Sequence, residues 1–309
     1  MIEIIRLLLP IYLVIGIGFL TVRLGYVKGG DLRATGRLVL SLFLPAVVFL
    51  AIGSSPGGEV LRFDFILAYA LGSLLSYGLA YVMAKLAGKE HGVAAFEGMG
   101  ASASNSAFLG LPIITMVVGP EVALQNFAVA ILIENLLMIP FSVMVIEASA
   151  GVSWSKLSGL LRGVIRNPIL IAAAAGVVWS FTGWDIPAVP RRVLEIMAPV
   201  AAPIALLTIG GAVAELRANA QRWGVVRVTL GKLIGHPLMT FFAMLAIGTL
   251  PEPLMLAGVV NAALPMMATY MLFGSRFGRE DVAATSLIAA TVLSFVTISG
   301  LLLLSGHLG

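Results

Sequence analysis

The chain has no cysteine and few charged residues, and each shortage excludes a class of protein. Without cysteine it forms no disulfide and no thiolate metal site, and it carries no cysteine nucleophile. Only 11% of its 309 residues are charged and 60% are hydrophobic, whereas about a quarter of a soluble domain is charged. No stretch of about 50 residues is polar enough to form a separate soluble domain. The composition therefore indicates an all-α polytopic membrane protein.

Segments of about 20 apolar residues predict ten transmembrane helices. They fall into two groups of five on either side of a polar cytoplasmic connection at residues 148–161. We therefore expect one five-helix repeat at residues 1–147 and a second at residues 162–309. The expected spans lie at about residues 2–23, 34–54, 63–86, 93–119, 121–147, 162–182, 192–214, 226–249, 253–274 and 281–304.

The distribution of lysine and arginine predicts how these spans are oriented. Fifteen basic residues fall on one side of the expected topology, and four, Arg6, Arg62, Arg191 and Arg192, fall on the other. Because positive residues favour the cytoplasmic side, both termini are expected on the non-cytoplasmic side of the cell (plasma or inner) membrane. The net charge of +4 thus reflects orientation in the lipid bilayer, and no nucleic-acid partner is expected. Because five is odd, the two groups cross in opposite senses, which is the condition for two inverted repeats.

The fourth and the ninth apolar spans each contain residues that interrupt a helix beside polar side chains. The fourth reads ASASNSAFLGLPIITMVVG at residues 101–119, where Gly110 and Pro112 both disfavour an unbroken helix. We expect this helix to open near residues 106–111 and to restart at Pro112. The ninth span reads VVNAALPMMATYMLFG around Pro265. Broken helices at corresponding positions of two halves indicate a transporter site.

Polar side chains precede both expected breaks. A helix that restarts in the membrane exposes unpaired N–H groups and the positive end of its dipole, so Pro112 and Pro265 are expected to mark termini that attract an anion. Asn105 and Asn261 either bind a carboxylate or satisfy the freed backbone groups. The predicted substrate-binding residues are Ser104, Asn105, Ser106, Gly110, Pro112, Asn135, Asn261, Ala262 and Pro265.

Glu134, Lys232 and His236 are the predicted coupling residues. Glu134 lies near the middle of its span, where an ionised carboxylate costs about 2.5 to 3.5 kcal/mol. It either binds a proton or cation coupled to transport, or stays neutral and hydrogen-bonds an opened backbone. Lys232 and His236 share one helix face at positions i and i+4. His236 is a candidate proton relay, and Lys232 either extends to the inner interface or attracts an entering anion.

Four motifs carry a resemblance to a known family: SNSAFLGLP from Ser104, RNP from Arg166, PIALLTIGG from Pro203 and NAALP from Asn261. Over nearly its whole length the chain resembles the auxin efflux carrier family, which includes bacterial carboxylate carriers. This family is similar in architecture to PIN-type auxin carriers and bile-acid sodium symporters. The resemblance implies that spans 4 and 9 cross at their breaks in a mobile transport domain with spans 3, 5, 8 and 10. It implies a scaffold of spans 1, 2, 6 and 7 that can form a homodimer.

The resemblance also implies elevator-type alternating access for organic anions. Bile-acid carriers bind sodium partly through glutamate and glutamine in the ninth span, and the ninth span here has neither. We expect a secondary transporter of small organic carboxylates, such as malate, malonate, lactate or an indole acid, with a proton or sodium as the open choice of coupling ion. The alternatives are a sodium-coupled symporter of the bile-acid-carrier type, a channel, or a polytopic membrane enzyme. No nucleophile with a base and no metal cluster is evident, and no cofactor is expected.

Overall fold

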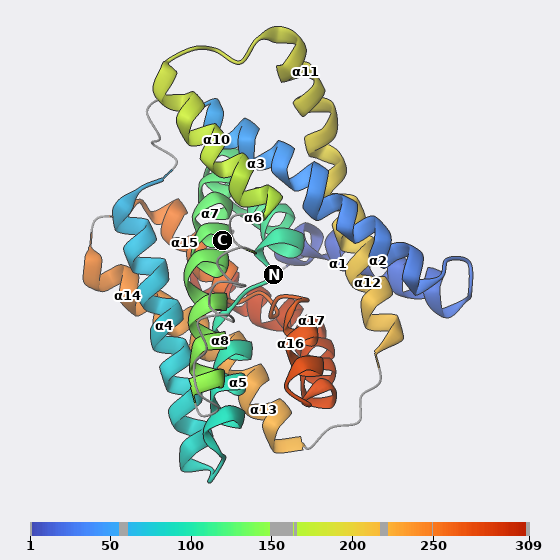
Figure 1. The fold of residues 1–309 in the computed structure, drawn as a ribbon, viewed down its shortest axis with the longest axis vertical. Coiled ribbons are helices and arrows are strands. Elements are labelled where there is room, and N and C mark those ends of the chain that lie inside the picture. The colour runs from blue at the N-terminus through green and yellow to red at the C-terminus, as the bar shows by residue number, and fades with distance from the viewer. Residues whose placement is uncertain are drawn as a thin grey trace.

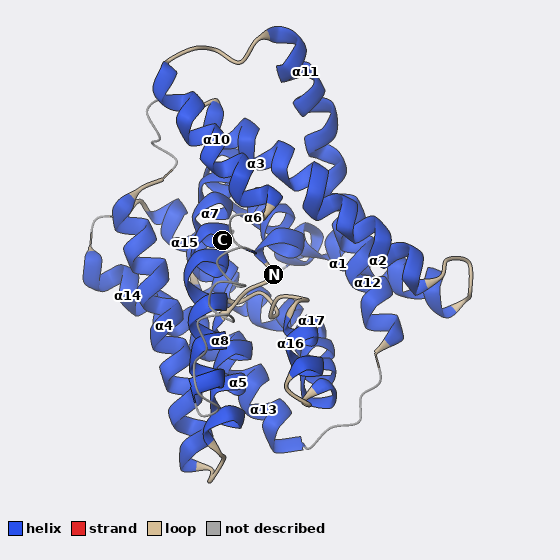
Figure 2. Ribbon diagram, viewed as in Figure 1, coloured by secondary structure: helices blue, strands red, loops and turns tan. Residues whose placement is uncertain are grey.

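The computed structural model describes residues 2–55, 61–148, 163, 166–216, 222–248 and 250–306. Every regular element in these residues is a helix (Figure 2), so the predicted all-α class is confirmed. The connection expected at residues 148–161 lies outside the described residues from position 149 on. Seven described helices are long and apolar enough to cross a membrane: Ile2–Arg23, Gly29–Gly53, Phe63–Leu86, Pro120–Glu147, Ala188–Glu215, Trp223–Ile247 and Glu280–Leu304. Two shorter apolar helices are Ser106–Val118 and Pro168–Thr182.

Some of these long helices consist of several elements, where η marks a π-helical or 3-10 turn. In chain order the elements are α1 (Ile2–Arg23), α2 (Gly29–Leu38), η1 (Val39–Phe43), α3 (Leu44–Gly53), α4 (Phe63–Leu86), α5 (His91–Ser102), η3 (Ser106–Gly110), α6 (Leu111–Val118), α7 (Pro120–Leu132), η4 (Ile133–Met138), α8 (Ile139–Glu147), α10 (Pro168–Thr182), α11 (Ala188–Met197), η6 (Ala198–Val200), α12 (Ala201–Glu215), α13 (Arg222–Leu230), η7 (Gly231–Gly235), α14 (His236–Ile247), α15 (Glu252–Ala262), α16 (Tyr270–Arg276) and α17 (Glu280–Leu304).

The helices pack in two groups (Figure 1). In the group at the top and right of the view, α1 and α2 lie against α12, and α3 lies along α10. In the other group, α4 lies against α5 and α14, α7 against α6 and α15, and both α13 and α16 against α17. Contacts of α1 with α17 and of α3 with α7 join the two groups. The second group contains the helices that end inside the bundle.

Close helix contact in the first group depends on glycine. Gly18 of α1 and Gly210 of α12 face the partner helix so closely that a β-carbon on either would overlap a backbone carbonyl, that of Leu207 or of Ile15 respectively. Small residues let membrane helices approach to the distance at which their backbones are in van der Waals contact. The pairing of α1 with α12 is therefore tight and leaves little room for sliding.

Proline explains the wide turns inside the long helices. A proline ring removes one backbone donor and clashes with the carbonyl four residues before it, and a π-helical turn relieves that clash by widening the helix. Each of the four π-helical turns in the described residues ends two residues before a proline; the pairs are η1 with Pro45, η3 with Pro112, η4 with Pro140, and η7 with Pro237. Three of these turns carry Ser106, Glu134 and Lys232.

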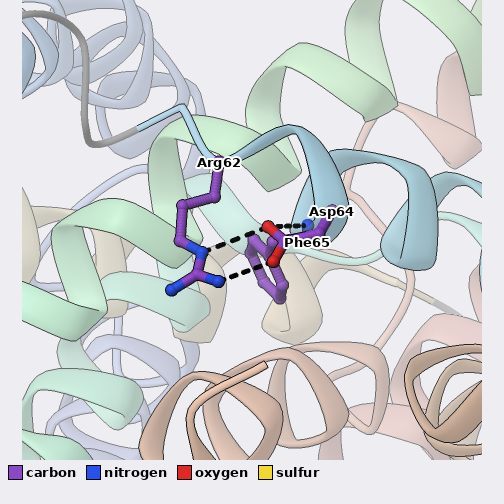
Figure 3. Close-up of polar contacts among 3 residues, drawn as sticks. All are labelled: Arg62, Asp64 and Phe65. Carbon is purple, nitrogen blue, oxygen red and sulfur yellow. Dashed lines mark hydrogen bonds and ion pairs between the residues drawn. The ribbon is translucent and has the colours of Figure 1, made fainter. Parts of the chain in front are cut away.

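An acidic side chain fixes the start of α4 (Figure 3). The Arg62 guanidinium donates to both carboxylate oxygens of Asp64, at 3.1 and 2.6 Å, and one of these oxygens also accepts from the Phe65 backbone N–H at 2.8 Å. A negative charge in the first turn stabilises a helix because it faces the positive end of the dipole. The buried Phe65 ring then anchors this end of α4 in the core.

Candidate functional site

Two pairs of helices meet end to end in the middle of the bundle. α5 ends at Ser102, and the next helix begins with η3 at Ser106. α15 ends at Ala262, and α16 begins at Tyr270. We call residues 103–105 the first interruption and residues 263–269 the second interruption. Each leaves backbone groups that no helix satisfies.

The two interruptions contact each other directly. The Asn105 backbone N–H donates to the Pro265 carbonyl at 2.9 Å, and Ser104 and Met266 form an isolated antiparallel bridge. All four residues are buried. The two extended segments therefore pair with each other and satisfy some of the backbone hydrogen-bonding groups that the ended helices leave unpaired inside the bundle.

The positions of the two prolines correct one expectation. The helix after the first interruption begins at Ser106 and not at Pro112, because η3 widens enough to carry the chain past the proline. Pro265 does not begin a helix either: it lies within the second interruption and contributes a carbonyl acceptor. The helix starts that face the middle of the bundle are thus Ser106 and Tyr270.

A buried hydrogen-bond network joins Asn261 to Glu134. The Asn261 amide nitrogen donates to Tyr69 Oη at 2.6 Å and to Ser106 Oγ at 2.9 Å. Ser106 Oγ donates in turn to Glu134 Oε1 at 2.5 Å. Glu134 is only 4% exposed. A short hydrogen bond from a hydroxyl to a carboxylate is one of the stronger interactions available in a medium of low dielectric constant.

Gly110 lies where the network is most crowded. A β-carbon at this position would lie 2.7 Å from Asn261 Oδ1 and 3.4 Å from the Leu264 side chain. Asn261 Oδ1 itself is buried and accepts no hydrogen bond from the described residues. The absence of a side chain at position 110 therefore lets the second interruption approach η3.

Lys232 lies at the contact between the interruptions. Its ammonium donates to the Ala262 carbonyl at 2.5 Å, to Ser104 Oγ at 2.9 Å and to His236 Nδ1 at 2.9 Å, and the residue is 0% exposed. It does not extend to the membrane interface, which was one of the two alternatives drawn from the sequence. The π-helical turn η7 directs the side chain into the bundle, where three acceptors satisfy it.

His236 is fixed by two partners. Because its Nδ1 accepts from the Lys232 ammonium, the neutral ring carries its proton on Nε2, and this atom donates to Ser73 Oγ at 3.0 Å. The ring is fully buried and lies 6.0 Å from the Tyr69 ring, centre to centre. Its place on the same helix face as Lys232 is what the i and i+4 spacing predicts.

The side chains of two predicted site residues lie differently. Asn135 donates to the Ile131 carbonyl at 2.9 Å and accepts from Asn167 of the other helix group at 3.1 Å, so it joins the groups and does not enter the network around Glu134. The Asn105 side chain, at the N-cap of η3, makes no capping hydrogen bond within the described residues. The polar side-chain atoms of Asn105 thus lie at the start of the helix but do not cap it.

Two residues of α4 take part in these buried hydrogen bonds but are not among the site residues predicted from the sequence. Tyr69 accepts from Asn261, and Ser73 accepts from His236. A signal exists: together with Ser76, which donates to the Ala101 carbonyl at 2.9 Å, they recur at i, i+4 and i+7 in an otherwise apolar span. Such a polar stripe marks one helix face directed into the bundle.

Comparison with known proteins places the chain in a family. A family model described as membrane transport protein matches residues 3–302. The chain belongs to the membrane transport protein family. This is the auxin efflux carrier family that the four motifs resemble, so the resemblance is confirmed.

The chain is also similar to named transporters over nearly their whole length. A protein of Rhizobium meliloti (strain 1021) named "Putative malonate transporter" is 28% identical over 98% of this chain and 96% of its own. "Uncharacterized transporter YfdV" of Escherichia coli (strain K12), like its Shigella flexneri counterpart, is 26% identical over 95% of both chains. The present chain is a membrane transporter with several membrane-spanning helices, and it is not an enzyme.

Proposed function

We propose that the chain is a secondary transporter of small organic carboxylate anions, with the anion held at the contact between the two interruptions. The observation that carries this proposal is the pairing of Asn105 with Pro265 inside the bundle, beside a buried lysine and a buried glutamate. The name of the Rhizobium meliloti relative supports malonate as the first substrate to test.

The helix ends favour an anion over a cation. The carbonyl end of α5 accepts from Ser76 at Ala101, and the carbonyl end of α15 accepts from Lys232 at Ala262. Both negative dipole ends are thus satisfied by the protein. Of the two positive ends, the start of η3 keeps N–H groups that a carboxylate can accept from, whereas the first N–H groups of α16, those of Tyr270, Met271 and Leu272, already donate to carbonyls of the second interruption. The side-chain amide of Asn105, which makes no capping hydrogen bond, adds further donors at the start of η3.

We infer proton coupling at Glu134 from the balance of buried charge. Glu134 and Lys232 are groups of opposite charge, and both are buried. An anion that enters this site adds one negative charge to a region of low dielectric constant. A proton on Glu134 would remove that excess, so one proton would accompany each singly charged anion, such as malonate with one of its two carboxyl groups protonated. The alternative, a sodium-coupled symporter, is an outcome of the experiments below.

The arrangement of the helices supports alternating access. In this proposal the pairs α5 with α6 and α15 with α16 each complete one crossing, which gives ten spans in two inverted repeats of residues 1–147 and 162–309. The group that contains both interruptions is the mobile transport domain, formed by spans 3–5 and 8–10. The group built on α1, α3, α10 and α12 is the scaffold, through which two copies would dimerise. Both termini would face away from the cytoplasm, as the positive residues predict.

Reconstitution tests this function. Proteoliposomes preloaded with malonate should take up labelled malonate by saturable counterflow, which a channel does not show. Uptake should be faster when a pH gradient drives protons in the same direction. Glu134→Gln, which mimics the protonated side chain, should keep the exchange and lose the acceleration by the gradient. Glu121→Gln, at the exposed start of α7, is the matched control and should behave as the wild type.

Two results would contradict the proposal separately. Absence of counterflow with malonate, malate, lactate and an indole acid would remove carboxylate transport. Unchanged proton dependence in Glu134→Gln would remove the coupling role of Glu134 and leave carboxylate transport in place.

A further inference from the structure

The Lys232 ammonium connects the two interruptions. On one side it donates to Ser104 Oγ in the first interruption, and on the other to the Ala262 carbonyl, where α15 ends. Neither residue is near Lys232 in sequence, since Ser104 lies 128 positions away and Ala262 lies 30. One cation therefore binds an oxygen of each broken span.

The ammonium has no proton left for a ligand. It carries three N–H donors, and Ser104, Ala262 and His236 accept one each. A substrate carboxylate could bind it only by displacing one of these acceptors, each of which is itself buried. Lys232 is consequently satisfied by the protein, and its role differs from that of the start of η3, where the anion would bind.

The atoms that accept hydrogen bonds from Lys232 indicate which kinds of cation this position can bind. A carbonyl at the end of a helix and a hydroxyl are the oxygen ligands that hard cations such as sodium accept, and the negative end of the α15 dipole attracts positive charge. The third acceptor, the ring nitrogen of His236, suits an ammonium better than a hard cation. Within the described residues no cluster of three or more acidic or histidine side chains offers a second cation site.

We propose that Lys232 is a resident cation, tethered to η7, which holds the two interruptions together in place of a cation drawn from solution. The inference rests on the proposed function, because it concerns the site at which the carboxylate would bind. Lys232 is then a positioning residue that acts through Ser104 and Ala262. Two consequences follow: carboxylate transport does not need sodium, and removal of the ammonium leaves a hole that a small free ammonium ion fits.

The test compares two variants of the full chain in detergent and in proteoliposomes. Lys232→Ala removes the charge and leaves space, whereas Lys232→Met removes the charge and fills the space. Both should melt about 10 °C below the wild type and exchange malonate at least about tenfold more slowly. Excess methylammonium chloride should restore at least half of the lost melting temperature in Lys232→Ala, because binding to the folded state stabilises it, and none in Lys232→Met. The wild type should give the same values in sodium chloride and in choline chloride.

Each outcome decides the question. If sodium instead of methylammonium restores the melting temperature of Lys232→Ala, the result also supports a cation position that the Lys232 side chain fills in the wild type. The inference is overturned if the wild type requires sodium, if Lys232→Ala behaves as the wild type, or if both variants respond equally to methylammonium. Should Lys232→Ala not fold, the sodium comparison on the wild type still decides. If no carboxylate is exchanged but methylammonium rescues Lys232→Ala alone, the proposed function fails and the tethered cation stands.

Discussion

The two interruptions differ in what they contribute to their contact. The first, at residues 103–105, is short and contributes one backbone donor, that of Asn105, together with the hydroxyl of Ser104 and the side-chain amide of Asn105. The second, at residues 263–269, is longer and contributes a backbone carbonyl, that of Pro265, while the Ala262 carbonyl at the end of α15 accepts from Lys232. One segment therefore supplies adaptable side chains and the other supplies fixed backbone acceptors. A substitution should thus affect the first through its side chains and the second through its packing.

The half-helices beside the interruptions are also anchored differently. α5, before the first interruption, is tied to α13 by a two-pronged ion pair in which Arg227 donates to both Glu97 oxygens, at 2.6 and 2.7 Å. α16, after the second, is tied to α8 by the pair of Arg276 with Glu147 at 2.5 Å. The first arginine is 17% exposed and the second 47%. Solvent screens the second pair much more than the first.

The largest effect is expected where the buried anchor is broken. Glu97→Gln leaves the Arg227 charge without its partner in a nearly buried place, which costs about 3 to 5 kcal/mol, and the melting temperature should fall by about 10 °C. Glu147→Gln breaks the exposed anchor and should lower it by about 2 °C. Thermal unfolding in detergent measures both. Equal losses would show that the two interruptions are anchored alike.

The next effect concerns the close approach of the two interruptions at Gly110. Gly110→Val places side-chain atoms where Asn261 Oδ1 lies, and such overpacking costs about 1 to 3 kcal/mol. We expect a lower melting temperature together with loss of malonate exchange, because η3 is pushed away from Asn261. Gly78→Val, on α4 with nothing within 4 Å of its added β-carbon, is the control. Similar behaviour of the two variants would contradict the close packing at η3.

A smaller effect separates the two asparagines. Asn261→Ala removes the donor to Tyr69 and Ser106 and should destabilise the fold by about 1 to 3 kcal/mol. Asn105→Ala should leave the melting temperature within about 1 °C, because its side chain caps nothing, and should weaken malonate binding about tenfold. Malonate titration and thermal unfolding on the same samples distinguish the roles. A destabilised Asn105→Ala with normal affinity would assign it a structural role.

The smallest effect lies outside both interruptions. Tyr12 of α1 forms a hydrogen bond with Ser294 of α17 at 2.8 Å and so joins the two helix groups. Tyr12→Phe should cost about 1 kcal/mol and change the rate of malonate exchange more than its affinity, because the groups would move past each other. Tyr26→Phe, at an exposed position, should change neither. A normal rate in Tyr12→Phe would count against movement at this contact.

The sequence predicted which polar residues lie close together beside the breaks better than it predicted the local geometry there. Ser104, Asn105, Ser106 and Asn261 are brought together as expected from polar residues beside breaks in apolar spans. The prediction that the helix starts at Pro112 was wrong, because a helix can accommodate a proline by widening into a π-helical turn as well as by breaking. Which of the two occurs depends on what the neighbouring helices can satisfy, and one span does not contain that information.

Composition by itself determined that the chain is helical and lies in a membrane, since about twenty apolar residues in a row can satisfy their backbone only as a helix. Only the tertiary structure decided that Lys232 turns inward to join Ser104 with Ala262 and that Asn135 contacts Asn167. A side chain's partner in these cases lies 30 to 128 residues away in the chain, so it is fixed by packing and not by local sequence.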